Sequence, residues 1–128
     1  FLSHRDYNLI SCGVLDDAVA SLALKHADVM LTRNRALVRE NLQILDDWIT
    51  AQPHFYYTKP QAGTTALVYY DFPIPSYDFC KRLYDETGAF VTPGDCFEQP
   101  QSMRIGYACD RPSLMGGLAA LSEFAKTL

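Results

Sequence analysis

The run TTALVYYDF, residues 64–72, is the stretch that decides the fold. It is rich in β-branched and aromatic residues, a composition typical of a buried strand. Pro73 and Pro75 follow it and end the strand, since proline has no backbone N–H for a ladder. Upstream, FYY at 55–57 and the turn residues PQAG at 60–63 predict a preceding strand and a hairpin. We therefore expect a sheet in the middle of this chain.

The sequence after residue 72 predicts a helix and two further strands. A short amphipathic helix should begin with Ser76 as its N-cap and end at Thr87, with Gly88 as the C-cap. Two strands, at 89–92 and 102–109, should follow, with a loop between them. The sheet therefore gains one strand on either side of this loop.

Helices flank the predicted sheet on both sides in the sequence. Residues 1–12 are aperiodic and are expected to be extended, whereas the segment from 13 to 26 has apolar residues at helical spacing. A long helix is expected at 28–51, and a last helix should start at Asp110, just before Pro112. We predict an α/β (α+β) two-layer sandwich, in which a small mixed or antiparallel sheet has helices mainly on one face and a long interdomain helix precedes it.

Length and composition exclude several classes of protein. The chain has 128 residues, which fits a single domain over residues 1–128. Hydrophobic residues make up 48% and charged residues 20%, so a disordered chain is excluded. The net charge is −4 and there is no basic block, so nucleic acid is not an expected partner. No apolar run is long enough to cross a membrane.

The cysteines and histidines form no metal-binding or disulfide pattern. Four cysteines are widely spaced without a Cys-x-x-Cys pair, and three histidines are scattered. We expect free thiols, no metal site and a reducing, cytoplasmic location. The chain starts with Phe1 instead of Met, so we expect it to be part of a longer protein.

Arg104 is the most informative single residue. It lies among apolar neighbours in a predicted strand, where its charge must face solvent or be paired. Gly106, two residues on, has no side chain on the same face, which leaves room for a planar carboxylate held by two hydrogen bonds. The alternative is a surface arginine opposite an acidic residue of a neighbouring strand.

Two other sequence features have structural explanations. The pair Gly116-Gly117 in the last helix predicts close helix packing. Four tyrosines are expected in the core or at an interface: Tyr56, Tyr57, Tyr69 and Tyr70.

Four stretches together resemble the C-terminal small domain of the class I/II aminotransferases, the fold type I enzymes that use pyridoxal phosphate. The resemblance covers essentially the whole chain. Its stretches are RDYNLIS at 5–11, RNRALVRENL at 33–42 with Trp48, KPQAGTTA at 59–66, and VTPGDCF at 91–97 followed by MRIGYA at 103–108.

The resemblance implies roles for a few residues. Arg104 matches the arginine that binds the α-carboxylate of the substrate. Gly63 and Thr64 would line the cleft, while Asn8 and Ser11 would approach the cofactor phosphate of the neighbouring subunit. The lysine that binds pyridoxal phosphate covalently would lie upstream of this region, so the resemblance implies no catalytic residue in this chain.

The function implied is that of a substrate-carboxylate-binding domain of an aminotransferase acting on an amino acid. The missing large domain and a second subunit, in a homodimer, would be its partners, and the chain alone would be inactive. Two alternatives remain open: a non-catalytic amino-acid-binding or interaction domain, and the same domain of a pyridoxal-phosphate lyase, decarboxylase or synthase.

Overall fold

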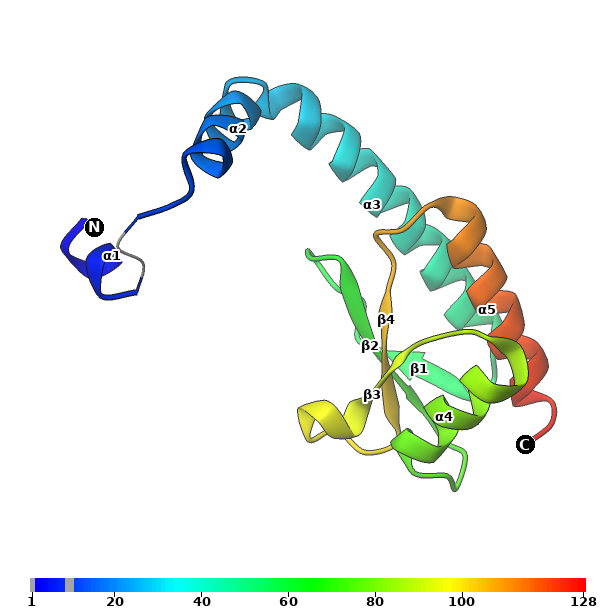
Figure 1. The fold of residues 1–128 in the computed structure, drawn as a ribbon. Helices are drawn as coiled ribbons and strands as arrows, with labels where there is room; N and C mark the ends of the chain where they lie inside the picture. The colour runs from blue at the N-terminus through cyan, green and yellow to red at the C-terminus, as the bar shows by residue number, and fades with distance from the viewer. Residues whose placement is uncertain (1, 9–10) are drawn as a thin grey trace. The chain divides into compact units, whose positions relative to one another are not determined.

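A computed structural model describes residues 2–8 and 11–128 (Figure 1). The chain divides into two compact units, Phe1–Ala36 and Leu37–Leu128. Helix α3, Ala27–Ala51, contributes residues to both. The expectation of one domain over residues 1–128 is not tested by this division.

The first unit contains the helices α1, Leu2–Asn8, and α2, Val14–Lys25. The extended conformation expected for residues 1–12 is wrong for 2–8; residues 1 and 9–10 lie outside the described part. The helix expected up to residue 26 is confirmed as α2. Its first turn carries Asp16 and Asp17, where acidic side chains stabilise the positive end of the helix dipole.

The second unit is built on a four-stranded antiparallel sheet. The strands are β1, Phe55–Tyr57; β2, Thr65–Tyr70; β3, Thr92–Pro93; and β4, Ser102–Gly106. Their order is β1-β2-β4-β3, and all three neighbouring pairs are antiparallel. The prediction of a small sheet centred on residues 64–72 is therefore confirmed.

Two strands are shorter than predicted, and hydrogen bonds explain both differences. The chain at 89–91 is still leaving helix α4, where the Ala89 amide donates to the Thr87 hydroxyl, so β3 is only Thr92–Pro93. Strand β4 ends at Gly106 instead of residue 109, because the carbonyl oxygens beyond it accept hydrogen bonds from the side chain of Asn41.

Helices cover one face of the sheet, as predicted. The helices are the C-terminal half of α3, then α4, Ser76–Thr87, and α5, Arg111–Ala125 (Figure 1). A single core joins these helices to alternate residues of the strands. Its largest fully buried side chains include Tyr70, Phe79, Leu45, Met103 and Phe124. The result is the expected two-layer α+β arrangement.

The helix ends agree with the sequence except at Ser76. Pro75 occupies the N-cap of α4, and the buried Ser76 hydroxyl instead accepts a hydrogen bond from the Ser102 amide. Ser76 as an N-cap is therefore wrong, because a partner in β4 uses its oxygen. Gly88 ends α4 with φ 77°, and the Asp110 carboxylate accepts from the Ser113 amide at 3.0 Å, as expected.

The prediction of close packing for the glycine pair is wrong, and the tyrosines divide between the two faces of the sheet. A Cβ added at Gly116 or Gly117 would meet nothing within 4 Å, so neither glycine is needed for close packing in this chain. Tyr70 is buried, as expected for a core residue, but Tyr56 is 57% exposed and stacks on Tyr69 on the other face of the sheet. Strand alternation explains the split, because Tyr56 and Tyr69 are paired and point the same way.

Candidate functional site

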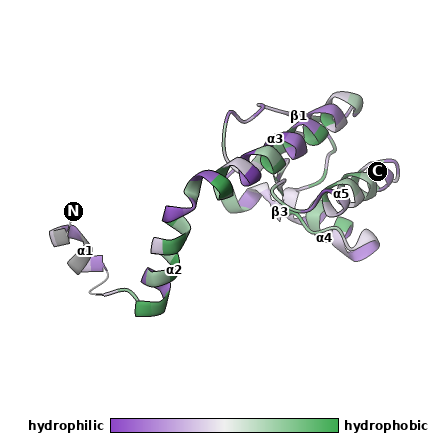
Figure 2. Cartoon of the chain, turned by 90° about the horizontal axis from the view of Figure 1, so that it is seen from above, coloured by the Kyte–Doolittle hydropathy of each residue, from purple (hydrophilic) through white to green (hydrophobic). Residues whose placement is uncertain are grey.

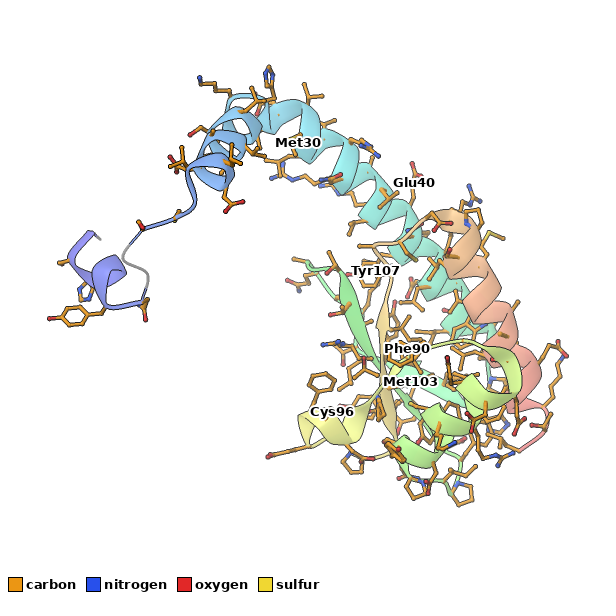
Figure 3. All side chains as sticks on the ribbon, in the orientation of Figure 1. Met30, Glu40, Phe90, Cys96, Met103 and Tyr107 are labelled. Carbon is orange, nitrogen blue, oxygen red and sulfur yellow. The ribbon has the colours of Figure 1, made fainter. Side chains whose placement is uncertain are left out.

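The face of the sheet opposite the helices carries the candidate site. Residues paired across an antiparallel ladder point to the same side, so the pairs Leu67–Arg104 and Thr92–Arg104 place these three side chains together. Met103 and Ile105, the two neighbours of Arg104 in β4, are buried in the core (Met103 is labelled in Figure 3). Arg104 is thus held on a strand whose alternate residues are fixed in the core.

The guanidinium of Arg104 has two neighbours within the second unit. Its Cζ lies 4.9 Å from the centre of the Phe97 ring, and its Nη2 donates a 3.3 Å hydrogen bond to the Thr92 hydroxyl. Phe97 belongs to the 3₁₀ helix η1, Gly94–Phe97, which connects β3 to β4. Three consecutive elements of the chain therefore meet at one cation.

No acidic side chain pairs with Arg104 in the described residues. The ion pairs found there join other groups, and each of them lies away from β4. The surface-arginine alternative required an acidic residue on a neighbouring strand, but the residues opposite Arg104 are Leu67 and Thr92. A Cβ added at Gly106 would meet nothing within 4 Å, so the space beside Arg104 is open. The guanidinium therefore has N–H groups that can donate hydrogen bonds to a carboxylate from outside the second unit.

The predicted cleft residues Gly63 and Thr64 lie at the same end of the sheet as Gly106. Both are exposed, and Gly63 has φ 97°, a conformation that favours glycine. Tyr107 stabilises this turn by two hydrogen bonds. Its amide donates to the Thr64 carbonyl at 2.9 Å, and its hydroxyl donates to the Gly63 carbonyl at 3.0 Å. The structure thus brings Gly63 and Thr64 to the strand that carries Arg104, while their role at a cleft stays a prediction.

The residues expected near a cofactor phosphate, Asn8 and Ser11, belong to the first unit. Both are exposed, and the Asn8 side chain donates a 3.4 Å hydrogen bond to the His4 carbonyl of its own helix. Their contact with a cofactor stays a prediction.

Three of the four lysines of this chain are paired with carboxylates. Lys59, Lys81 and Lys126 pair with the carboxylates of Asp46, Asp85 and Glu123, respectively, and Lys25 is exposed on α2. A lysine that reacts with an aldehyde must be neutral, which requires a lowered pKa. Pairing with Asp85 instead raises the pKa of Lys81.

The cysteines and the possible metal ligands of the described residues do not form a second candidate site. All four cysteines are free, as the sequence predicted, and burial raises the pKa of the Cys80 thiol to about 12. In residues 2–8 and 11–128 no three His, Cys, Asp or Glu side chains gather in a way that could hold a metal ion. No helix in that part of the chain is long and apolar enough to cross a bilayer.

Sequence reasoning missed two contributors to the site's geometry. Phe97 belongs to the stretch VTPGDCF that resembles the family. Its contact with Arg104 depends on the 3₁₀ helix η1, which the sequence did not predict. Asn41 is 2% exposed and its amide donates to the carbonyls of Tyr107 and Cys109, both at 2.8 Å. Its spacing could have indicated this, because Asn41 shares a helix face with the apolar Leu45 and a buried amide needs partners.

Known proteins share this fold and sequence along nearly the whole chain. A capreomycidine synthase of Streptomyces vinaceus is 37% identical over 120 residues, which are 93% of this chain and 31% of that protein. A pyridoxal-phosphate-dependent aminotransferase of Streptococcus suis 89-1591 superposes with a TM-score of 0.92 and 42% identity over 98% of this chain and 33% of its own.

A third relative is the pyridoxal-phosphate-dependent cyclase OrfR, which superposes with a TM-score of 0.87 and 27% identity. It is matched over 98% of this chain and 35% of its own. The chain therefore spans about a third of the length of the relatives it matches.

The sequence profile of one family accounts for both the relatives and the site. The profile described as "Aminotransferase class I and II" matches residues 3–121, which include the long helix, the sheet and Arg104. This family implies pyridoxal phosphate as the cofactor of the parent enzyme. The chain belongs to the class I and II aminotransferase family.

Proposed function

We propose that this chain is the substrate-carboxylate-binding part of a pyridoxal-phosphate-dependent aminotransferase that acts on an amino acid. The observation that carries the proposal is Arg104, an exposed guanidinium on the open face of a rigid sheet, beside the space at Gly106 and facing no acidic residue of the neighbouring strands. A carboxylate matches a guanidinium with two parallel hydrogen bonds, which fixes the position of the substrate as well as its charge.

This chain's contribution would be to bind and orient. Arg104 would hold the carboxylate at a fixed place on the sheet, and holding a reactant in position lowers the barrier of the reaction. Pyridoxal phosphate, when bound in the longer enzyme, would supply the electron-withdrawing chemistry. Because none of the lysines in this chain fits a covalent cofactor site, that group would be held by residues outside it.

Kinetics of the longer protein test the role of Arg104. Arg104→Lys keeps the charge but loses the second hydrogen bond, which is worth about 1.5–3 kcal/mol when charge-assisted. We expect kcat/KM for an amino acid to fall about 10- to 150-fold. Arg104→Ala should lose more, since it removes the cation altogether.

A matched substrate without a carboxylate and a control variant separate an effect on carboxylate binding from a general loss of activity. An amine that lacks the carboxylate should react equally with the wild type and with Arg104→Lys. Arg111→Lys, which changes an exposed arginine at the start of α5, should leave both substrates unaffected. If Arg104→Lys impaired the amine as much as the amino acid, Arg104 would be structural.

The 128-residue chain should not transaminate without the rest of the enzyme. Incubation with pyridoxal phosphate, reduction with borohydride and peptide mapping would detect a covalent adduct on lysine. We expect no stoichiometric adduct on any one lysine. A single modified lysine together with turnover would contradict the proposal.

A second candidate reaction is favoured by the relatives themselves. Two of them are a synthase and a cyclase rather than aminotransferases. The longer protein should therefore be assayed with an amino acid in the presence and absence of a 2-oxo acid. Dependence on the 2-oxo acid would establish transamination, and product formation without it would favour a synthase or cyclase. Amino-acid binding without any turnover would leave the non-catalytic alternative.

A further inference from the structure

We propose that Phe97 is a positioning residue for Arg104: its ring fixes the plane of the guanidinium so that the open edge meets a carboxylate. The inference rests on the function proposed for Arg104. The evidence for the role of Phe97 is separate from that function, because it concerns how the Arg104 side chain is held in the absence of a ligand.

The geometry places the Arg104 guanidinium over the ring of Phe97. The 4.9 Å distance from the Arg104 Cζ to the ring centre is within the range of a cation–π contact. The Thr92 hydroxyl takes one Nη2 hydrogen of the same group at 3.3 Å. The ring contact acts on the whole guanidinium and the hydrogen bond on one of its nitrogens, so together they restrict its orientation.

The short helix η1 is itself held firmly, which makes Phe97 a fixed support. Gly94 is buried so closely against the chain that a Cβ there would lie 2.2 Å from the Gln99 carbonyl oxygen. The Gln99 amide donates back to the Gly94 carbonyl at 3.0 Å. On the open face, the Tyr69 hydroxyl donates to the Gln99 side chain at 2.9 Å.

Fixing the arginine beforehand matters because long side chains lose rotamer freedom on binding. An arginine already held in its binding orientation pays less of this entropy when the ligand arrives. A cation–π contact at an exposed site corresponds to about a two- to fivefold change in an equilibrium constant. Phe97 should therefore modulate carboxylate affinity moderately, whereas Arg104 determines whether binding occurs.

Nuclear magnetic resonance of the ¹⁵N-labelled 128-residue chain tests this positioning directly. The ring current of Phe97 should displace the Arg104 Nε–H signal, and its heteronuclear Overhauser effect should report an ordered side chain. Phe97→Leu should move this signal toward that of a free arginine and reduce the order. Phe97→Tyr keeps a ring and should restore both. Because Phe97 is 40% exposed, neither substitution should unfold the chain, and the amide spectrum would verify this.

Titration with sodium acetate at constant ionic strength tests the effect on binding. We expect Phe97→Leu to weaken acetate binding at the Arg104 signal about two- to fivefold and Phe97→Tyr to leave it unchanged. Thr92→Val, which removes the second anchor but keeps the shape, should also weaken it. Arg104→Lys serves as the reference without a guanidinium, and for this comparison acetate binding is followed in every variant at the main-chain amide signals of residues 103–106.

The outcomes separate this inference from the proposed function. If Phe97→Leu left the order and position of the Arg104 signal unchanged, the positioning role would be wrong whatever the acetate titration showed. Unchanged acetate affinity in a well-folded Phe97→Leu, alongside a large loss in Arg104→Lys, would overturn the positioning role and support the carboxylate site. Equal acetate effects in the wild type and in Arg104→Lys would instead count against the proposed function.

Discussion

The side-chain amide of Asn41 donates a 2.8 Å hydrogen bond to the main-chain carbonyl of Tyr107, which lies 66 residues further along the chain. The same amide nitrogen donates to the Cys109 carbonyl at 2.8 Å. Helix α3 is thereby tied to the segment that follows the arginine-bearing strand. Asn41 is almost fully buried, so these carbonyls have no easy access to water if the amide is removed.

Asn41→Leu should destabilise the chain by about 2–4 kcal/mol, because it leaves one buried and one partly buried acceptor without a donor. Urea unfolding followed by circular dichroism would measure the loss. Gln43→Ala is the matched control, since Gln43 is an exposed amide on the same helix that bonds only to the nearby Asp47. Equal stability of Asn41→Leu and the wild type would show that water replaces the amide.

Asp46 should make the stability of the chain depend on pH in the acidic range. Hydrogen bonds from Lys59, at 2.5 Å, and from the Tyr57 hydroxyl, at 2.7 Å, hold the pKa of its carboxyl below the usual 3.8. A carboxyl whose folded pKa is lowered stabilises the fold above its unfolded pKa, and this contribution is lost as the pH falls through the folded pKa.

The difference in unfolding midpoint between wild type and Asp46→Asn should therefore be constant near neutral pH and shrink below about pH 4. Lys59→Met should reduce the same acid-dependent part, because the bond from Lys59 is the largest cause of the lowered pKa. Urea titrations at a series of pH values would measure it. A difference that grew on acidification would have the wrong sign for this account.

Gly94 and the pair Gly116 and Gly117 should respond oppositely to alanine. A Cβ at Gly94 would lie 1.9 Å from the Ser102 hydroxyl oxygen, so Gly94→Ala must displace η1 and should cost about 1–3 kcal/mol. At Gly116 and Gly117 the space is open, and alanine in a helix is favoured over glycine by about 1 kcal/mol. Thermal unfolding should show a lower midpoint for Gly94→Ala and a higher one for the other two. Destabilisation by Gly116→Ala would show that this glycine is needed for packing after all.

We expect the chain to self-associate through α2. None of its residues is buried, and Leu15 and Val19 are 82% and 66% exposed at helical spacing. Hydrophobic segments colour much of the α2 ribbon green in Figure 2. Exposed apolar surface of this kind favours contact with a second copy. Sedimentation velocity at micromolar concentrations should show dimers that Leu15→Asp abolishes, with Asp16→Ser, on the polar side, as the control. A wild type that stays monomeric would contradict this.

The sheet and the long helix were predictable because their signals are local. The run at 64–72 contains its own β-branched pattern, and the stripe of Leu45 and Ile49 requires nothing beyond the helix period. The end of β4 was not predictable, since it depends on hydrogen bonds from Asn41, far away in the sequence. The start of β3 depends on how the chain leaves α4, where the Ala89 amide donates to the Thr87 hydroxyl. Arg104 could be singled out from its neighbours, but the aromatic ring beneath it follows from a turn whose geometry only Gly94 permits.

Tyr107 links the Gly63–Thr64 turn to strand β4 by two hydrogen bonds, one from its amide and one from its hydroxyl. The two accepting carbonyls flank Thr64, so a displacement of the turn on its own would break one or both hydrogen bonds. If Arg104 binds a substrate as proposed, a movement of the sheet toward that substrate would carry the turn with it, and the arginine and the turn would arrive together.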